Sequence, residues 1–254
     1  MLAPERRELI LKDLRANGGV ETDAIAERFD VSVETIRRDL LALEKRDLAK
    51  RVYGGAVMVP RPRGEGSHDE REILARKEKA AIADRVASLI PETGTVFLDL
   101  GTTVEAVARA IPRTFKGMIV TASLRAVGTL SQLPEAEIVV TGGRLRKNEW
   151  SLSGNMATEF LDGLYPDLAI ISVGAIGLDA GVTDYDFDEV HLKQSALKNS
   201  HVSIVVADST KFASVAPFRI CDLATPTYIA TDEGLDQSYI TQLEERGANL
   251  LLAT

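Results

Sequence analysis

The chain of 254 residues contains one cysteine, Cys221, and three histidines. A single cysteine cannot form an intramolecular disulfide, and His68, His191 and His201 do not have metal-ligand spacing. We therefore expect no disulfide framework, no metal site and no cofactor. The chain also lacks an apolar run of membrane-spanning length, and its N-terminus lacks the apolar core of a signal peptide. These absences predict a cytoplasmic protein without membrane contact.

The charge of the chain is unevenly distributed. The formal net charge is −8, which by itself disfavours binding to nucleic acid. Residues 32–63, however, hold eight Lys and Arg against four Asp and Glu, whereas residues 64–254 hold seventeen against twenty-seven. A basic segment beside an acidic body is typical of a DNA-binding head attached to a domain that does not bind DNA.

Residues 32–44 predict a helix suited to the major groove of DNA. The hydroxyl of Ser32 can cap its first turn, and Glu34 is placed favourably for the helix dipole. Isoleucine and leucine recur at helical spacing and form one apolar face, away from which Thr35, Arg37 and Arg38 project. Because a recognition helix needs exposed hydrogen-bonding groups near its N-terminal end, this segment predicts DNA binding.

The neighbouring segments predict the rest of a winged helix-turn-helix. Pro4 suits the start of a first helix, and Thr22 can cap a second short helix. After the third helix, 48–53 and 56–59 can pair as strands around Gly54-Gly55. The expected contacts of this hairpin with the DNA backbone are Lys50, Arg51, Tyr53 and Gly54.

A plain helical bundle with surface arginines is the alternative interpretation of this region. In that case Glu34 and Arg38, four residues apart, would form an exposed ion pair and nothing more. The order of two helices, a basic helix and a basic hairpin favours DNA binding instead. We expect residues 1–58 to form this domain, 59–74 to form a linker containing two prolines and two glycines, and 75–254 to form a second domain.

The second domain alternates short apolar runs with helical segments. Many of these runs are continuously apolar, which is typical of strands covered on both faces. The alternation predicts a mainly parallel sheet within an α/β/α sandwich. The expected strands are 96–100, 118–121, 137–141, 168–173, 202–207, 227–230 and 249–252. The expected helices are 80–89, 104–111, 123–132, 153–163, 188–199 and 236–246.

Small, hydroxyl and glycine residues follow several of these strands. Because ligands of parallel sheets bind outside the carboxyl ends of the strands, these loops predict a site for a phosphate-sized anion. The turn 101–103 is the best phosphate candidate, since it opens directly into a helix. The candidate ligand-binding residues at the strand ends are Asp99, Gly101, Thr102, Thr103, Thr121, Ser123, Gly142, Gly143, Arg144, Gly174, Asp208 and Lys211.

Asp184, Glu189 and Lys193 add acid and base groups to the second domain. Glu189 and Lys193 are four residues apart and share one face of a helix. They could form a surface ion pair, bind the hydroxyl groups of a ligand or transfer protons in an enzyme.

Two sets of motifs resemble the DeoR family of bacterial transcriptional regulators. In the head they are Val-Ser-Val-Glu-Thr-Ile-Arg-Arg-Asp-Leu at 31–40 and Arg-Val-Tyr-Gly-Gly-Ala-Val at 51–57. In the second domain they are Leu-Asp-Leu-Gly-Thr-Thr at 98–103, Thr-Gly-Gly-Arg at 141–144, Gly-Ala-Ile-Gly at 174–177, Gly-Val-Thr-Asp at 181–184, Glu189 with Lys193, and Ala-Asp-Ser-Thr-Lys-Phe at 207–212. The chain departs from the family pattern at Tyr53, often a histidine, at Asp47, usually a glycine, and at Ala122, commonly an asparagine.

The resemblance implies a small winged helix-turn-helix head followed by an effector domain similar in fold to sugar-phosphate isomerases. It also implies a non-enzymatic repressor of sugar or carbohydrate metabolism genes. Its partners would be operator DNA, a phosphorylated sugar or related metabolite, and further copies of the chain in a homodimer or homotetramer. Two alternatives remain: a sugar-phosphate isomerase-like enzyme, or a DNA-binding protein whose second domain only oligomerises. The basic head disfavours the first alternative, and the polar strand-end loops disfavour the second.

Overall fold

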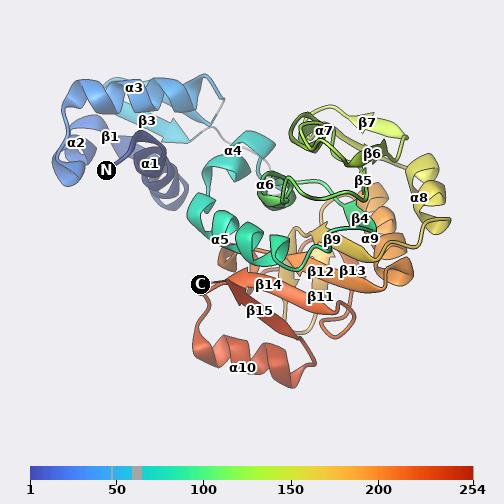
Figure 1. The fold of residues 1–254 in the computed structure, drawn as a ribbon. Coiled ribbons are helices and arrows are strands. Elements are labelled where there is room, and N and C mark those ends of the chain that lie inside the picture. The colour runs from blue at the N-terminus through green and yellow to red at the C-terminus, as the bar shows by residue number, and fades with distance from the viewer. Residues whose placement is uncertain (47, 59–64, 254) are drawn as a thin grey trace. The chain divides into compact units, whose positions relative to one another are not determined.

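The computed structural model describes residues 1–46, 48–58 and 65–253. The chain forms two compact units, Met1–Arg76 and Lys77–Thr254 (Figure 1). The segment expected as a linker is only partly described, because 59–64 lie outside the described residues. Its later part contains a short helix, α4 (His68–Ile73), that the sequence did not predict and that belongs to the first unit.

The first unit combines three helices with a small antiparallel sheet. Its elements before α4 are α1 (Ala3–Asn17), β1 (Gly19–Glu21), α2 (Thr22–Phe29), α3 (Val33–Glu44), β2 (Ala49–Val52) and β3 (Gly55–Met58). The sheet order is β1-β3-β2, and β1 was not predicted. The apolar faces of the helices meet in one core that contains Ile10, Leu14, Ile36, Leu40 and Leu43. This arrangement is the expected winged helix-turn-helix.

Two details of the first unit differ from the expectation. Thr22 is the first residue of α2 and not its cap, since Glu21 occupies the cap position without a side-chain hydrogen bond. The hairpin turns at Tyr53-Gly54 and not at Gly54-Gly55, because Gly55 already pairs with Val52. Gly54 has a φ of 79°, which a glycine adopts without the steric cost of a Cβ. Asp47 and the expected strand end at Val59 lie outside the described residues.

The second unit is built on a parallel sheet, and the sequence located each of its strands to within one or two residues at either end. Its order in the described chain is β15-β14-β12-β9-β4-β5-β6. The bounds are β4 (Thr95–Leu98), β5 (Met118–Thr121), β6 (Glu137–Val140), β9 (Leu168–Ser172), β12 (Val202–Val206), β14 (Tyr228–Asp232) and β15 (Leu250–Ala253). All pairs in this sheet are parallel.

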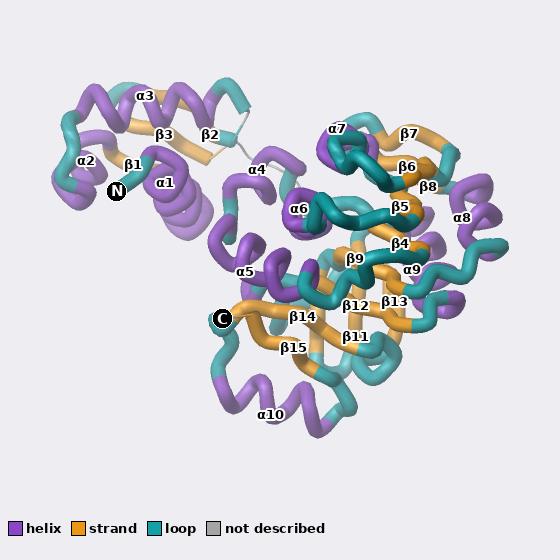
Figure 2. Tube along the Cα trace, viewed as in Figure 1, coloured by secondary structure: helices purple, strands orange, loops and turns teal. Residues whose placement is uncertain are grey.

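Helices cover both faces of this sheet, as the tube in Figure 2 also shows. Alternate residues of one strand reach opposite cores: Val96 and Leu98 enter one core, and Phe97 enters another. The first face packs against α5 (Arg76–Ala87), α6 (Thr102–Ala110) and α7 (Leu124–Leu130). The second face packs against α8 (Asn155–Asp162), α9 (Phe187–Asn199) and α10 (Gln237–Glu245). This is the predicted α/β/α sandwich.

Short antiparallel strands extend the connections at the carboxyl ends of the parallel strands. They are β7 (Arg144–Arg146), β8 (Ser151–Ser153), β10 (Ala175–Gly177), β11 (Gly181–Asp184) and β13 (Phe218–Cys221), and the sequence analysis missed all of them. A 3-10 turn, Ser209–Lys211, follows β12. Among the described residues, no helix is both long and apolar enough to cross a membrane.

Candidate functional sites

The outer face of α3 carries two exposed arginines. Ser32 Oγ accepts a hydrogen bond from the backbone N–H of Thr35, which is the predicted cap and starts the helix. The side chains of Arg37 and Arg38 are 66% and 78% exposed and lie 3.9 and 3.6 Å from the carboxylate of Glu34. Such loose, exposed pairs contribute little to stability, so both guanidinium groups are available to a ligand.

The hairpin of β2 and β3 presents a second polar surface. Lys50 is exposed, and Tyr53 at the turn is fully exposed. Arg51 is held instead against the end of α3: its Nε donates to Glu44 Oε2 at 2.6 Å, and its backbone N–H donates to Glu44 Oε1 at 3.0 Å. These hydrogen bonds lower the pKa of the Glu44 carboxyl. Arg51 thus fixes the hairpin against α3, while Lys50 and Tyr53 extend into solvent.

Asp39 is a buried carboxylate of α3 that the sequence analysis did not single out. It is 1% exposed. Arg6 Nε lies 2.5 Å from its Oδ2, and Arg7 Nε lies 2.8 Å from its Oδ1. Both arginines belong to α1, so the pair joins the first helix to the third.

In the second unit, Lys193 is the centre of a buried charged group at the strand ends. Its Nζ lies 2.7 Å from Asp184 Oδ2 and 3.0 Å from Asp99 Oδ2, and it donates to the carbonyl of Ser172 at 3.0 Å. Lys193 and Asp99 are 1% or less exposed. Burial alone would lower the pKa of Lys193, but Asp184 and Asp99 outweigh it and raise that pKa, so the ammonium stays charged. The structure therefore joins three of the predicted residues: Asp99 directly after β4, Asp184 at the end of β11 and Lys193 in α9.

Glu189 lies beside this group but has partners of its own. It is 1% exposed and accepts from Arg146 Nη1 at 3.0 Å and from Ser151 Oγ at 3.1 Å. Burial raises the pKa of the Glu189 carboxyl to about 7, although Lys193 and Arg146 oppose that rise. A surface ion pair between Glu189 and Lys193 was one interpretation of the sequence, and it is wrong, because both side chains face inward.

The turn before α6 adjoins the charged group. Gly101 is the N-cap of α6, has a φ of 97° and makes no side-chain cap. A Cβ at Gly101 would lie 3.2 Å from Ser172 Oγ, the hydroxyl that Lys193 and Asp99 both contact. The first backbone N–H groups of a helix have no partners within the helix and favour an anion. The main chain of this turn therefore lies directly beside Ser172 and the charged group.

Other predicted residues either stabilise loops and helix ends or lie at the surface. Thr121 and Ser123 serve the fold, since Thr121 Oγ1 bridges to the Asp99 carbonyl and to the Ser123 N–H, and Ser123 Oγ caps α7. Asp208 caps the 3-10 turn that contains Lys211. Arg144 pairs with Asp188 at the surface. Gly142 and Gly143 connect β6 to β7, and Gly174 follows β9, with its N–H donating to the Thr183 carbonyl.

Ser172, Arg146 and Ser151 were not among the residues that the sequence predicted for a ligand site. Ser172 was read only as part of a strand, and Ser151 lies in a strand too short to be recognised. Arg146 ends β7, a strand that the sequence did not predict. A polar groove of about 400 Å³ between α8 and α9 was also not predicted. It is lined by Asp162 of α8 and by Asp188, His191 and Lys198 on the face of α9 opposite Glu189 and Lys193, so it is separate from the charged group.

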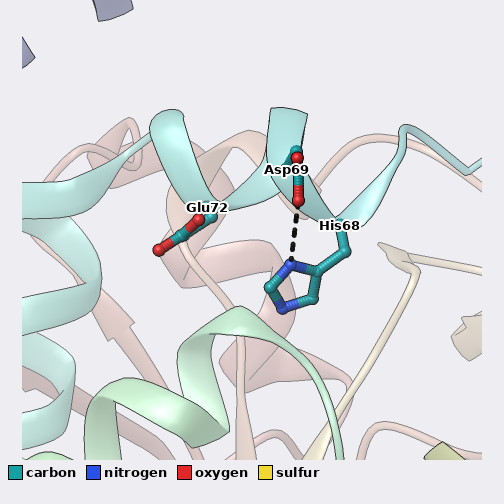
Figure 3. A group of neighbouring side chains, drawn as sticks. All are labelled: His68, Asp69 and Glu72. Atoms are coloured by element: carbon teal, nitrogen blue, oxygen red, sulfur yellow. Dashed lines mark ion pairs between the residues drawn. The ribbon is translucent and has the colours of Figure 1, made fainter. Parts of the chain in front are cut away.

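One histidine and two carboxylates of α4 form a compact group in the first unit. Figure 3 shows His68, Asp69 and Glu72. One imidazole nitrogen and one oxygen of each carboxylate, the atoms that could bind a metal ion, lie within 4.8 Å of one another. Arg46 Nη2 lies 2.6 Å from Glu72 Oε2, and its Nε lies 3.5 Å from Asp69 Oδ2. Arg46 thus supplies the compensating charge, and the two carboxylates tie α4 to the residues that follow α3.

Comparison with protein families agrees with this architecture in both units. The DeoR-like helix-turn-helix domain matches residues 6–61, and the DeoR C-terminal sensor domain matches residues 74–233. This chain belongs to the DeoR family. The charged α3 face lies within the first match, and Asp99, Asp184, Glu189 and Lys193 lie within the second.

Named relatives extend over nearly the whole chain. The chain is 34% identical over 247 residues to the glycerol-3-phosphate regulon repressor of Haemophilus influenzae, covering 97% of this chain and 96% of that protein. It is 32% identical over 250 residues to the putative aga operon transcriptional repressor of Escherichia coli O157:H7, covering 98% and 93%. Among solved structures, ribose 5-phosphate isomerase A from Methanocaldococcus jannaschii matches 55% of each chain with 14% identity and a TM-score of 0.40.

Proposed function

We propose that this DeoR-family regulator is a repressor that releases or tightens on operator DNA when its sensor unit binds a small phosphorylated metabolite. The observation that carries the proposal is the buried group of Lys193, Asp99 and Asp184 beside the uncapped N-terminus of α6. Carboxylates suit the hydroxyl groups of a ligand, and free backbone amides suit a phosphate. The named relatives, repressors of a glycerol-3-phosphate regulon and of an aga operon, support the same class of ligand.

For DNA binding, we assign the contacts to α3 and the hairpin. Arg37 and Arg38 have the exposure and reach for guanine edges or phosphates, and Thr35 lies near the helix N-terminus. Lys50 and Tyr53 would contact the backbone beside the groove. Ser32, Glu34, Arg51 and Gly54 then act mainly by shaping these two elements, since their described contacts are within the unit.

For the effector, we assign the phosphate to the turn 101–103 and the hydroxyl end to the charged group. Lys193 is held by two carboxylates and the Ser172 carbonyl, so we do not assign it to the phosphate. We assign Glu189 and Asp184 as acceptors of hydrogen bonds from the ligand hydroxyls. Turnover is not part of the proposal, because the relatives named above are repressors.

The proposed mechanism couples two sites through oligomerisation. Two heads held together by their sensor units, in a homodimer or homotetramer, would bind two operator half-sites. We expect the ligand to bind more tightly to the protein with its heads in one arrangement than in another. If the two binding free energies differ by about 1.4 kcal/mol, the ligand changes DNA affinity tenfold. As a DNA-binding regulator, the protein would act in the cytoplasm.

The experiment that tests this proposal is a thermal-shift screen of the full chain. Glycerol 3-phosphate and several sugar phosphates are each compared with the unphosphorylated compound. A ligand at a hundred times its Kd adds about 2.7 kcal/mol of stability. We expect a shift that requires the phosphate, that is lost in Thr102→Val, and that persists in Thr241→Val, a matched change on the exposed face of α10.

Either of two outcomes would contradict the assignment of the site. If the shift is equal for phosphorylated and unphosphorylated compounds, the ligand is not recognised by its phosphate. If both Thr102→Val, which removes a hydroxyl, and Gly101→Ala, which perturbs the main chain of the turn, retain the full shift, the phosphate binds elsewhere. If a sugar phosphate is consumed during a long incubation with the protein and an isomer of it appears, the isomerase-like alternative is favoured instead.

A further inference from the structure

Asp39 occupies an unusual position on the helix assigned to DNA recognition. It follows Arg38 directly in sequence, yet its carboxylate is buried whereas the side chain of Arg38 is 78% exposed. Each of its oxygens is contacted by a different guanidinium, Oδ2 by Arg6 and Oδ1 by Arg7. None of the contacts proposed for DNA uses these three residues.

The position of Asp39 around the helix axis explains what the pairing can do. Side chains advance by about 100° per residue along an α-helix. Asp39 therefore lies at the border between the apolar face, formed by Ile36, Leu40 and Leu43, and the face that carries Arg38. Apolar contacts are not directional, so the packed face of the helix limits its rotation only coarsely. Two charge-assisted hydrogen bonds to α1 are directional and fix that rotation.

A small rotation of α3 would matter for base recognition. With side chains included, an α-helix has a radius of about 5–6 Å, so a turn of ~20° moves a side-chain tip by roughly 2 Å. Hydrogen bonds to base edges tolerate only a few tenths of an ångström. Contacts between Arg37 or Arg38 and a phosphate are less affected, because a flexible cation can follow a nearby charge.

We propose that Asp39 is a positioning residue for sequence-specific DNA recognition. Its buried pairing with Arg6 and Arg7 sets the rotation of α3 and thereby the placement of Arg37 and Arg38 at base edges. The inference rests on the proposed role of α3 as the recognition helix. It predicts a loss of discrimination between DNA sequences and not a general loss of DNA affinity.

The test compares specific with non-specific binding by the full chain. A preferred duplex is first selected from a random pool with the unaltered protein, and a scrambled duplex of the same composition serves as the non-specific probe. Fluorescence anisotropy then gives Kd for both duplexes with Asp39→Asn and with Ile10→Val. Ile10 is a fully buried residue of α1, outside the elements assigned to DNA, so its variant controls for a modest loss of stability.

We expect Asp39→Asn to weaken binding to the selected duplex by about tenfold to a hundredfold, the range associated with losing one good base contact. Binding to the scrambled duplex should change by less than about threefold, with the same salt dependence, because the exposed cations remain. Ile10→Val should leave the ratio of the two affinities unchanged. An unchanged ratio in Asp39→Asn, or an equal fall in Ile10→Val, would overturn the proposal.

A second variant keeps the proposal testable if Asp39→Asn fails to fold. Arg7 is 36% exposed in its side chain, and Arg7→Lys keeps its charge but loses the guanidinium geometry. It should lower the same ratio by a smaller factor, and an unchanged ratio in this folded variant would also refute the proposal. Arg38→Ala distinguishes failure of the recognition role of α3 from failure of the positioning role of Asp39. If it leaves selective binding intact, α3 is not the recognition helix; if it abolishes selectivity while Asp39→Asn and Arg7→Lys do not, only the positioning role fails.

Discussion

Replacing Glu189 by glutamine should stabilise the sensor unit above neutral pH. Glutamine retains an acceptor for Arg146 and Ser151 but cannot ionise. Burial raises the pKa of Glu189 from an ordinary value of 4.5 to about 7, and that value already includes the attraction of Lys193 and Arg146. At about 1.4 kcal/mol per pKa unit, ionising Glu189 inside the fold costs up to about 3 kcal/mol more than ionising it in the unfolded chain.

The sign of this pH effect follows from proton binding. Between pH 4.5 and 7 the folded state holds a proton that the unfolded state has released. The free energy of unfolding of the unaltered protein therefore falls as pH rises through this window. In Glu189→Gln the corresponding fall is absent. The two proteins should be equally stable near pH 4 and differ by up to about 3 kcal/mol at pH 8.

Urea denaturation between pH 4 and pH 8 measures the free energy of unfolding of both proteins. Urea is uncharged, so it does not screen the electrostatic interactions as a salt would. Trp150 is the single tryptophan and precedes Ser151, which donates to Glu189, so its fluorescence follows the sensor unit. Glu159→Gln, an exposed change on α8, controls for removing one negative charge and should show no such pH-dependent gain. If Glu189→Gln is less stable than the unaltered protein at pH 8, Arg146 and Lys193 outweigh burial and the reasoning is refuted.

Three further predictions concern the two proposed sites. Arg38→Ala should weaken operator binding at least tenfold and leave the ligand-induced thermal shift unchanged; retained operator affinity would exclude α3 as the recognition helix. Gly101→Ala should destabilise the sensor unit by about 1–2 kcal/mol, since its φ is 97° and its Cβ would crowd Ser172 Oγ, and should abolish the phosphate-dependent shift. Gly128→Ala, where a Cβ meets open space, should be neutral or stabilising by both measurements. Lys50→Ala should reduce the slope of log K against log salt by about 1, and an unchanged slope would remove Lys50 from the DNA backbone.

The parallel sheet was predictable because its strands are buried on both faces. Segments such as Leu168–Ser172 and Val202–Val206 pack between two helical layers, so nearly every position is apolar and the run is visible in sequence. The helix faces were visible for a similar reason, although Leu89, the last residue of the expected helix 80–89, is 39% exposed and lies just beyond the end of α5. The short strands β7 and β8 span three residues each, which is too few for a periodic pattern to emerge.

The partners of the charged residues could not be predicted in the same way. Helical spacing placed Glu189 and Lys193 on one face, which is correct, but it suggested that they pair with each other. In the fold, Lys193 instead contacts Asp99, 94 positions earlier in the chain, and Glu189 contacts Arg146 from a hairpin that was not predicted. Asp39 is hidden for the same reason, since its partners on α1 are more than 30 positions away. Local patterns show which side chains share a face and not which distant chain segment covers that face.

The hydrogen bonds that the Lys193 ammonium already makes limit where a phosphate can bind in the sensor unit. A lysine ammonium has three protons, and here they are shared among two carboxylates and Ser172. A phosphate placed against Lys193 would have to displace Asp99 or Asp184 and leave a buried carboxylate without its counter-charge, which is costly. The backbone amides at the start of α6 are not hydrogen-bonded by a side-chain cap. They lie beside the same charged group, because Gly101 is next to Ser172. We therefore propose that a phosphate binds at α6 and that ligand hydroxyls face Asp184 and Glu189, while Lys193 holds Asp99 and Asp184 in place.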